Sequence, residues 1–187
     1  MKKILIVIDM QNDFITGSLG TPEAQAIVPN VVSVIKNFAK GDIYYTQDTH
    51  SRDDYSETLE GQKLPIQHCI SGTAGWEIEE SVGDELNAKF GEKSIHGPYC
   101  VEKITFGSND LVDNIEFDSD ILESITLVGL CTDICVVSNA LLLRAAFPNT
   151  KIVVYEDCCA GTTPENHQAA LTVMKSCQID IERSVEE

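Results

Sequence analysis

Residues 124–155, SITLVGLCTDICVVSNALLLRAAFPNTKIVVY, contain a helix pattern between two strand patterns. Ser124–Val128 and Lys151–Tyr155 are short runs rich in β-branched and other apolar residues, which favour buried strands. The segment between them predicts a helix from about Asp133 to Phe147. A strand, a helix and a second strand in this order are typical of a parallel sheet with helices on its faces.

The same alternation continues toward both ends of the chain. Further strands are predicted at Lys3–Ile8, Asp42–Thr46, Tyr99–Lys103 and near Ile179–Ile181. Helices are predicted at about Pro22–Lys40, near Trp76–Phe90, after Ser108, and from Thr163 and Pro164 onward. The sequence therefore predicts the α/β class, a three-layer α/β/α, Rossmann-like arrangement with a mainly parallel central sheet.

Length and composition limit the number of domains. A chain of 187 residues with 43% hydrophobic content can bury one substantial core, so we expect a single domain over residues 1–187. The polar stretch Gln47–Gly97 lacks clear periodicity apart from its one predicted helix. Long irregular segments in compact domains are often functional, so this stretch is expected to contribute to function.

The charge of the chain argues against two classes of partner. Acidic residues outnumber Lys and Arg by 30 to 13, which gives a formal charge of -17. Nucleic acids and anionic membranes are bound mainly through Lys and Arg, so neither is expected as a partner. The apolar run Ile4–Ile8 is too short for a secretory signal or a membrane span, and we expect a cytoplasmic protein.

The cysteine content indicates free thiols. There are seven cysteines, at positions 69, 100, 131, 135, 158, 159 and 177. An odd number without an export signal makes a disulfide framework improbable. Because no Cys-x-x-Cys spacing occurs, a zinc site of the finger type is not expected either.

Several ionisable residues follow predicted strands. Asp9, Asp48 and Lys103 each stand at the end of such a strand, and the turn Gly129–Cys135 follows another. In open parallel sheets, ligands bind outside the carboxyl ends of the strands. These side chains are therefore expected to face one crevice.

Cys135, Asp9 and Lys103 are the candidates for nucleophilic chemistry. Cys135 lies where a strand leads into a helix, a position at which backbone N–H groups are expected to lower a thiol pKa. An inert buried cysteine, a structural ion pair of Asp9 and a solvated Lys103 are the alternatives. If the three side chains meet, the ammonium favours the thiolate and the carboxylate can accept its proton.

Asp48, His50 and His68 are candidate metal ligands. Asp48 and His50 are two residues apart along a strand end and so point to the same side. Together with His68 they offer one oxygen and two imidazole nitrogens, which suits zinc, manganese or iron. Glu57 and Glu60 lie between them and could complete the shell, whereas a loop-capping role for His68 is the alternative.

Taken together, these segments resemble the isochorismatase-like cysteine hydrolases, and most closely the nicotinamidase/pyrazinamidase branch. The resemblance covers most of the chain. The motifs that carry it are, in order, IDMQNDF (8–14), DTH (48–50), HCISGT (68–73), the strand ending at Lys103, and GLCTDIC (129–135).

The resemblance implies roles for individual residues. It assigns Asp9, Lys103 and Cys135 to a catalytic triad. It also implies a cis peptide between Leu130 and Cys131, and an oxyanion hole formed by the N–H groups of Cys131 and Cys135.

The resemblance further implies a metal site and a substrate pocket. Asp48, His50 and His68 match the metal set of the nicotinamidase branch, with one divalent transition metal, most simply zinc, holding the pyridine nitrogen. Phe14 matches a ring-contacting aromatic, and the pocket is expected to include Leu130 and Ile134. The family often has a tryptophan just before the last metal histidine, but KLPIQ (63–67) contains no aromatic residue, and the extra histidine of some nicotinamidases is absent from residues 51–67.

The implied activity is hydrolysis of a small amide through a thioester acyl-enzyme, with nicotinamide as the best candidate substrate and NAD metabolism as the context. A homo-oligomer is expected. Two alternatives stay open: a hydrolase of another small amide or of a ureido or carbamoyl compound, and a non-catalytic thiol-sensing or ligand-binding relative. The presence of Cys135 disfavours isochorismate as substrate, because true isochorismatases lack this cysteine.

Overall fold

A computed structural model describes residues 2–90, 99–117 and 122–184 of the chain. Its centre is a six-stranded sheet in the order β3-β2-β1-β4-β5-β6, in which every neighbouring pair is parallel. The strands are β1 (Lys2–Ile8), β2 (Ile43–Asp48), β3 (Cys100–Lys103), β4 (Leu122–Leu130), β5 (Lys151–Ala160) and β6 (Asp180–Glu182). The predicted parallel α/β sheet is thereby confirmed.

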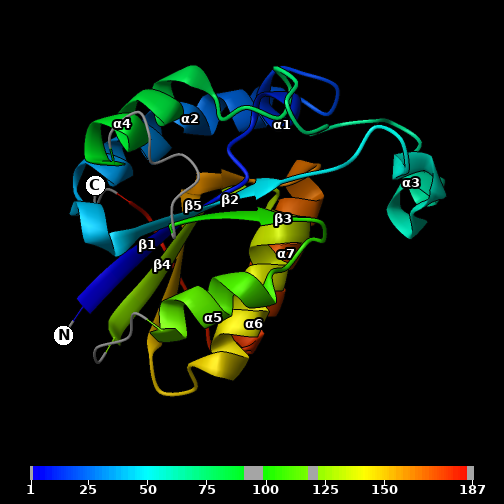
Figure 1. The fold of residues 1–187 in the computed structure, drawn as a ribbon. Helices are drawn as coiled ribbons and strands as arrows, with labels where there is room; N and C mark the ends of the chain where they lie inside the picture. Colours follow the sequence, from blue (N-terminus) through cyan, green and yellow to red (C-terminus); the bar gives the residue numbers. More distant parts are fainter. Residues whose placement is uncertain (1, 91–98, 118–121, 185–187) are drawn as a thin grey trace.

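Helices cover both faces of this sheet (Figure 1). The α-helices are α1 (Asn12–Ile15), α2 (Pro22–Lys36), α3 (Leu59–Lys63), α4 (Glu80–Phe90), α5 (Asn109–Phe117), α6 (Val137–Ala146) and α7 (Pro164–Ser176). Helices α2 and α4 lie on one face, and α5, α6 and α7 lie on the other (Figure 1). The fold is therefore the expected three-layer α/β/α arrangement.

Two apolar cores result from the alternation of side chains along β1. Leu5 and Val7 point toward α2 and α4, whereas Ile4, Ile6 and Ile8 point toward α5, α6 and α7. All five side chains are buried. Burial on both faces explains why this strand is a continuous apolar run rather than an alternating one.

Some element bounds differ from those predicted. Helix α2 ends at Lys36 instead of Lys40, because Asn37 and Phe38 bond to carbonyls three residues back and tighten the last turn. The helix predicted from Asp133 starts as a π-helical turn over Thr132–Val136, before α6. Strand β5 is five residues longer than predicted, since it resumes pairing with β4 after an irregularity.

The stretch predicted to be irregular contains a short 3₁₀ turn, Tyr55–Glu57, and α3, which projects from the side of the molecule (Figure 1). Helix α4 begins at Glu80 rather than near Trp76. Residues 91–97 of this stretch lie outside the described part. None of the described helices is long and apolar enough to cross a membrane.

The strand order places a switch point between β1 and β4. From β1 the chain first adds β2 and β3 on one side and then returns to add β4, β5 and β6 on the other. Ligands of such sheets bind at the carboxyl ends of the strands beside this point. Gly129 allows close contact there: its φ is +118°, and a Cβ at this position would lie 2.1 Å from the Ile8 carbonyl oxygen.

Candidate active site

The predicted ionisable residues come together at the carboxyl edge of the sheet. Asp9 directly follows β1, Lys103 ends β3, and Cys135 lies in the π-helical turn after β4. The Lys103 Nζ lies 2.7 Å from Asp9 Oδ2 and 3.5 Å from Cys135 Sγ. It also lies 3.3 Å from Oδ1 of Asp48, the last residue of β2. A single ammonium group thus connects the three other strand ends.

Asp9 is held in an unusual backbone conformation. Its φ is +47°, in the left-handed region that Asp and Asn tolerate better than most residues. The Thr46 hydroxyl donates a 2.6 Å hydrogen bond to Asp9 Oδ1 and accepts one from the Asp9 N–H. Complete burial raises the pKa of Asp9, and Lys103 partly opposes this effect. The carboxyl group is therefore prepared to take up a proton.

The thiol of Cys135 differs from the sequence-based expectation. Its position near a helix start predicted a lowered pKa, but burial raises the pKa well above the usual value, and Asp9 adds to the increase. Lys103 acts in the opposite direction. The expectation was wrong because the side chain is buried against Ile8, Val136 and other core residues instead of facing solvent at a free helix end. The resting group is therefore a thiol that needs a base.

Lys103 remains charged although it is buried. Burial alone would lower its pKa, but Asp9, Cys135 and Asp48 raise the pKa well above the usual value. The solvated lysine considered from sequence is thus excluded: only 4% of this residue is exposed. The ammonium compensates two carboxylates that could not otherwise be buried together.

Four side chains next to this group could hold a metal ion. One donor atom from each of Asp48, His50, Glu60 and His68 lies within 4.8 Å of the others. Asp48 Oδ2 is 2.9 Å from His50 Nε2 and 3.4 Å from His68 Nε2. Glu60 Oε1 is 3.5 Å from His68 Nε2 and 3.8 Å from His50 Nε2. Of the two glutamates left open by the sequence, Glu60 belongs to this group and Glu57 does not.

The hydrogen bonds of the two histidines fit metal binding. The His68 Nδ1 lies 2.9 Å from the Ile66 carbonyl, which leaves Nε2 directed at Asp48 and Glu60. The His50 Nε2 is buried without a hydrogen-bond partner in the described part, although Asp48 Oδ2 is near. Two carboxylates and two imidazoles arranged in this way suit zinc or a similar divalent ion.

Two buried amides support the site and were not singled out from sequence. Gln11 clamps the backbone of Asp48: its Nε2 donates to the Asp48 carbonyl and its Oε1 accepts from the Asp48 N–H, both at 2.8 Å. Asn139 on α6 donates to the carbonyls of Cys135 and Phe106 and accepts from Ser108 N–H. Gln11 stands within the conspicuous 8–14 motif, but nothing in the local pattern marked Asn139.

The turn between β4 and α6 has the backbone geometry that the resemblance predicts. The Leu130–Cys131 peptide bond is cis. After it, the Thr132 hydroxyl lies 2.8 Å from His167 Nδ1, and Asp133 accepts hydrogen bonds from the N–H and hydroxyl of Thr162. These contacts connect the turn to the start of α7. Burial raises the pKa of Cys131 to about 12, so this second thiol stays protonated at neutral pH.

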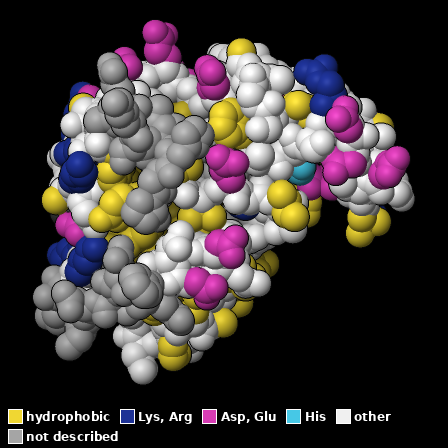
Figure 2. Space-filling model, in the orientation of Figure 1, with side chains coloured by type: hydrophobic (Ala, Val, Ile, Leu, Met, Phe, Trp, Pro, Cys, Tyr) yellow, Lys and Arg dark blue, Asp and Glu magenta, His cyan; other side chains and the backbone are white. Residues whose placement is uncertain are grey.

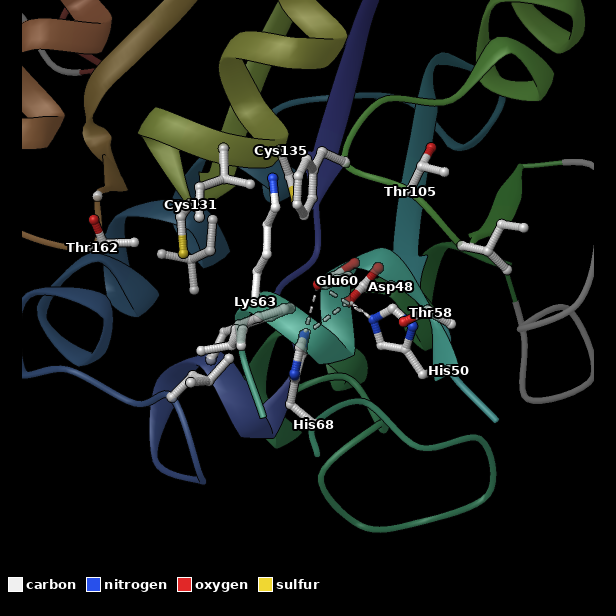
Figure 3. Close-up of a pocket in the computed structure, with 18 of the residues that line it drawn as sticks. Asp48, His50, Thr58, Glu60, Lys63, His68, Thr105, Cys131, Cys135 and Thr162 are labelled. Carbon is white, nitrogen blue, oxygen red and sulfur yellow. Dashed lines mark ion pairs between the residues drawn. The ribbon is translucent and has the colours of Figure 1, made fainter. Parts of the chain in front are cut away.

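A cavity of about 780 Å³ opens onto Cys135 and the metal-binding group (Figure 3). Phe14, Leu130 and Ile134, the three residues expected to form the pocket, are among those that line it. Trp76 does not line the cavity; its indole N–H donates a hydrogen bond to the Thr49 hydroxyl. The cavity therefore contains a thiol at one end, a set of metal-binding donors beside it, and largely apolar walls.

The protein is a doubly wound, three-layer α/β protein with a group of ionisable side chains at the carboxyl ends of its strands. The chain belongs to the isochorismatase family, because the Isochorismatase domain pattern matches residues 3–184. This is the family that the sequence motifs predicted.

Named relatives cover nearly the whole chain. The nicotinamidase/pyrazinamidase of Mycobacterium tuberculosis is 26% identical over 96% of this chain and 97% of its own. The crystal structure of a Bacillus subtilis nicotinamidase/pyrazinamidase has a TM-score of 0.80 at 29% identity, covering 98% of this chain and 100% of that one. The Pyrococcus horikoshii pyrazinamidase in complex with zinc has a TM-score of 0.76 at 26% identity, covering 98% and 99%.

Proposed function

We propose that this protein is a nicotinamidase-like amidohydrolase in which Cys135 attacks a small amide, with nicotinamide as the best candidate, and that residues 1–187 act as one hydrolase domain. The observation that carries the proposal is the contact of Lys103 Nζ with both Asp9 and Cys135. A thiol with a raised pKa needs a base within reach, and Asp9 is a carboxylate whose own pKa is raised. The names of the relatives support the reaction class.

The reaction begins with transfer of the thiol proton from Cys135 to Asp9. The thiolate attacks the amide carbon, and the N–H groups of Cys131 and Cys135 receive the oxyanion, with each donor contributing about 3 kcal/mol at comparable sites. Asp9 then returns the proton to the leaving nitrogen, so ammonia departs and a thioester remains. Water, deprotonated by Asp9, cleaves the thioester to the acid and restores the thiol.

Lys103 holds this arrangement together through the cycle. Its ammonium stabilises the thiolate while Asp9 is protonated, and it stabilises the Asp9 carboxylate when the thiol has its proton back. One negative charge, on either Cys135 or Asp9, therefore stays beside the Lys103 ammonium throughout the cycle. Asp48, His50, Glu60 and His68 would hold a divalent metal ion, which when bound supplies a coordination position for the pyridine nitrogen of the substrate.

Ammonia release from a panel of amides tests this function. The purified protein is incubated with nicotinamide, pyrazinamide and a set of carbamoyl and ureido compounds, and ammonia is measured by a coupled assay. Nicotinamide is expected to be hydrolysed, with nicotinate identified as the second product. Turnover of carbamoyl compounds alone would replace nicotinamide by the second substrate class, and no turnover of any member would contradict the proposed activity.

Metal content gives an independent prediction. Protein purified without a histidine tag is expected to contain close to one transition metal per chain by elemental analysis. His50→Ala and His68→Ala should each empty the site, because too few fixed donors remain. Glu60→Gln should weaken retention, whereas Glu57→Gln, a nearby and exposed position, should not. Equal metal content in the two glutamate variants would show that Glu60 is not a ligand.

A further inference from the structure

The helix that carries Glu60 has little apolar contact with the rest of the protein. Helix α3 is five residues long, and of these residues only Gly61 is buried, while Leu59 is 69% exposed. Helix α3 projects from the side of the molecule (Figure 1), and Figure 2 shows exposed hydrophobic and acidic side chains close together in that region. A helix this short is not stable by itself, so specific contacts must fix its position. The position of Glu60 depends on those contacts.

Tyr55 is bonded to both ends of α3. Before the helix, the Tyr55 carbonyl accepts hydrogen bonds from the Thr58 hydroxyl, at 2.7 Å, and from the Thr58 N–H, at 3.1 Å. The same hydroxyl caps the helix, because it accepts a hydrogen bond from the Gly61 N–H. After the helix, the Tyr55 hydroxyl donates to the Leu64 carbonyl at 2.8 Å, and the Leu64 N–H donates to the Glu60 carbonyl. Glu60 thus lies in a helix whose two capping residues both bond to Tyr55.

Tyr55 also contacts both metal-binding histidines. Its side chain is buried, and its ring packs edge-on against His50, with 5.0 Å between the ring centroids, and against His68, with 5.5 Å. On its other side, the Tyr55 main chain lies so close to Gly61 that a Cβ there would overlap the Tyr55 carbonyl oxygen. Tyr55 therefore lies between α3 and the two imidazoles and touches both.

The hydrogen-bond partners of Tyr55 determine where the protons of this group lie. The Leu64 carbonyl can only accept, so the Tyr55 hydroxyl gives it its single proton. The hydroxyl oxygen, 3.3 Å from His68 Nδ1, and the Ile66 carbonyl, 2.9 Å from it, are then both acceptors for a proton on Nδ1. Nδ1 therefore carries a proton, which leaves Nε2 as the metal-binding nitrogen of His68. One hydroxyl group thus orients this imidazole and anchors the helix of Glu60.

We propose that Tyr55 is a positioning residue for the metal site, which holds α3 so that Glu60 stays within reach of an ion bound beside His68. Tyr55 is not one of the four donor residues itself. In the absence of an ion, the carboxylates of Glu60 and Asp48 repel each other, and the hydrogen bonds of Tyr55 oppose their separation. The donors are therefore arranged before the ion binds. This inference rests on the metal site of the proposed function.

The affinity of Tyr55→Phe protein for zinc tests the inference. Bound metal is removed with a chelator, and zinc is then titrated back in competition with a chromophoric chelator of known affinity. The substitution keeps the ring but removes the hydroxyl that anchors α3, so the dissociation constant for zinc should rise about tenfold. An unchanged dissociation constant would overturn the inference.

A double-mutant cycle identifies the ligand through which Tyr55 acts. Glu60→Gln removes the carboxylate. In that background, Tyr55→Phe should raise the dissociation constant by less than about threefold, since the ligand that the hydroxyl helps to place is already gone. The full tenfold effect in both backgrounds would mean that Tyr55 does not act through Glu60, which contradicts the inference.

Cobalt substitution adds a spectroscopic measurement. The visible absorption of bound Co²⁺ depends on the number and the arrangement of its ligands. The spectrum of Tyr55→Phe protein should therefore shift toward that of Glu60→Gln protein. A spectrum identical to that of the wild type would show that the ligands are placed equally well without the hydroxyl, and the inference would fail.

Tyr44→Phe is the matched control. Tyr44 and Tyr55 are each 1% exposed, and the ring of Tyr44 also packs edge-on against another aromatic ring. Tyr44 belongs to the core beneath α5, α6 and α7 and not to the metal-binding group. Both substitutions remove one buried hydroxyl, and thermal unfolding of the metal-free proteins measures the loss of stability. Equal losses of zinc affinity in the two variants would indicate general loosening of the fold and would rule out a specific role of Tyr55.

A second variant keeps the inference testable if Tyr55→Phe protein does not fold. Thr58→Ala removes the hydroxyl that bonds to the Tyr55 carbonyl at the opposite end of α3, and it should also weaken zinc binding. Normal zinc affinity in Thr58→Ala protein would then overturn the inference.

The zinc measurements need no substrate, so they separate this inference from the proposed activity. Wild-type protein that binds zinc but hydrolyses no amide contradicts the activity alone, and the comparison of Tyr55→Phe with Tyr44→Phe still decides the role of Tyr55. Wild-type protein that binds no zinc contradicts the metal site, and the inference with it.

Discussion

Replacement of Cys135 by alanine is expected to abolish amide hydrolysis, with kcat falling by at least about 10⁴-fold. The reason is that no other thiol can take over the attack. Cys131 lines the same cavity, but burial raises its pKa to about 12, so it stays protonated at neutral pH. Ammonia release under substrate saturation measures the effect. Activity above a few per cent of wild type would remove Cys135 from its assigned role.

Cys159→Ala is the matched control for this variant. Cys159 is on β5, is as buried as Cys135, and packs in the same core, but it does not line the cavity. Both substitutions remove a buried sulfur and should lower stability by a similar amount, about 1 kcal/mol. Only Cys135→Ala should lose turnover. Parallel losses of activity in the two proteins would indicate that packing, and not nucleophilic attack, explains the result.

Asp9→Asn is expected to lower kcat by roughly 10²- to 10⁴-fold, because an amide cannot accept the thiol proton. Asparagine tolerates the positive φ of this position and keeps the size of the side chain, so the fold should persist. The variant should still lose about 3 kcal/mol of stability, since the 2.7 Å contact with the Lys103 ammonium loses its charge. Kinetics and chemical denaturation, measured on the same preparation, give the two values.

Asp48→Asn makes a useful comparison because Asp48 is the second carboxylate in contact with Lys103. The two variants remove the same charge from the same ammonium. Asp9→Asn should retain bound metal, whereas Asp48→Asn should lose it, since only Asp48 belongs to the metal-binding group. If the folded fraction of Asp9→Asn protein were fully active, Asp9 would be a structural residue and the base would have to be sought elsewhere.

The sheet and its two layers of helices could be predicted from the sequence because the central strands are marked by long runs of apolar residues. β1 is a continuous apolar run after Lys3, and residues 125–130 of β4 are buried and mostly apolar; such runs occur where helices bury both faces of a parallel sheet. Bounds were less certain where tertiary contacts decide them. The second half of β5, for example, exists because Cys159 and Ala160 pair with the end of β4, and no local sequence pattern predicts that pairing.

The strand-end residues of the site could be predicted for the same reason. Asp9, Asp48 and Lys103 each interrupt or end an apolar run, and parallel strands bring their carboxyl ends to one edge. The choice between Glu57 and Glu60 could not be made, since both lie in a segment without periodicity. It depends on a single short helix, α3, which starts where the Thr58 hydroxyl accepts a hydrogen bond from the Gly61 N–H.

The protonation state of Cys135 could not be predicted from the sequence. A cysteine after a strand and before a helix suggests an activated thiolate, but its pKa depends on how deeply the side chain is buried and on which charges face it. Ile8 and Val136 help to bury the thiol, and Lys103 supplies a charge that faces it. Ile8 and Lys103 are far from Cys135 in the sequence, and only the fold brings them near. Asn139 was missed for a related reason, because an amide within a helix pattern gives no sign of pointing inward.

The close approach of Gly129 to Ile8 has a consequence for how such an enzyme can change over evolution. Asp9 follows Ile8 directly, and the turn that carries Cys131 and Cys135 follows Gly129 by two residues. The spacing of acid and thiol is therefore set by main-chain atoms in contact, independent of which side chains fill the cores above and below. Apolar residues there can be exchanged for others of equal volume without moving either group. A chain that shares 29% of its residues with a relative can therefore keep the same overall fold, because exchanges of core side chains leave this backbone contact in place.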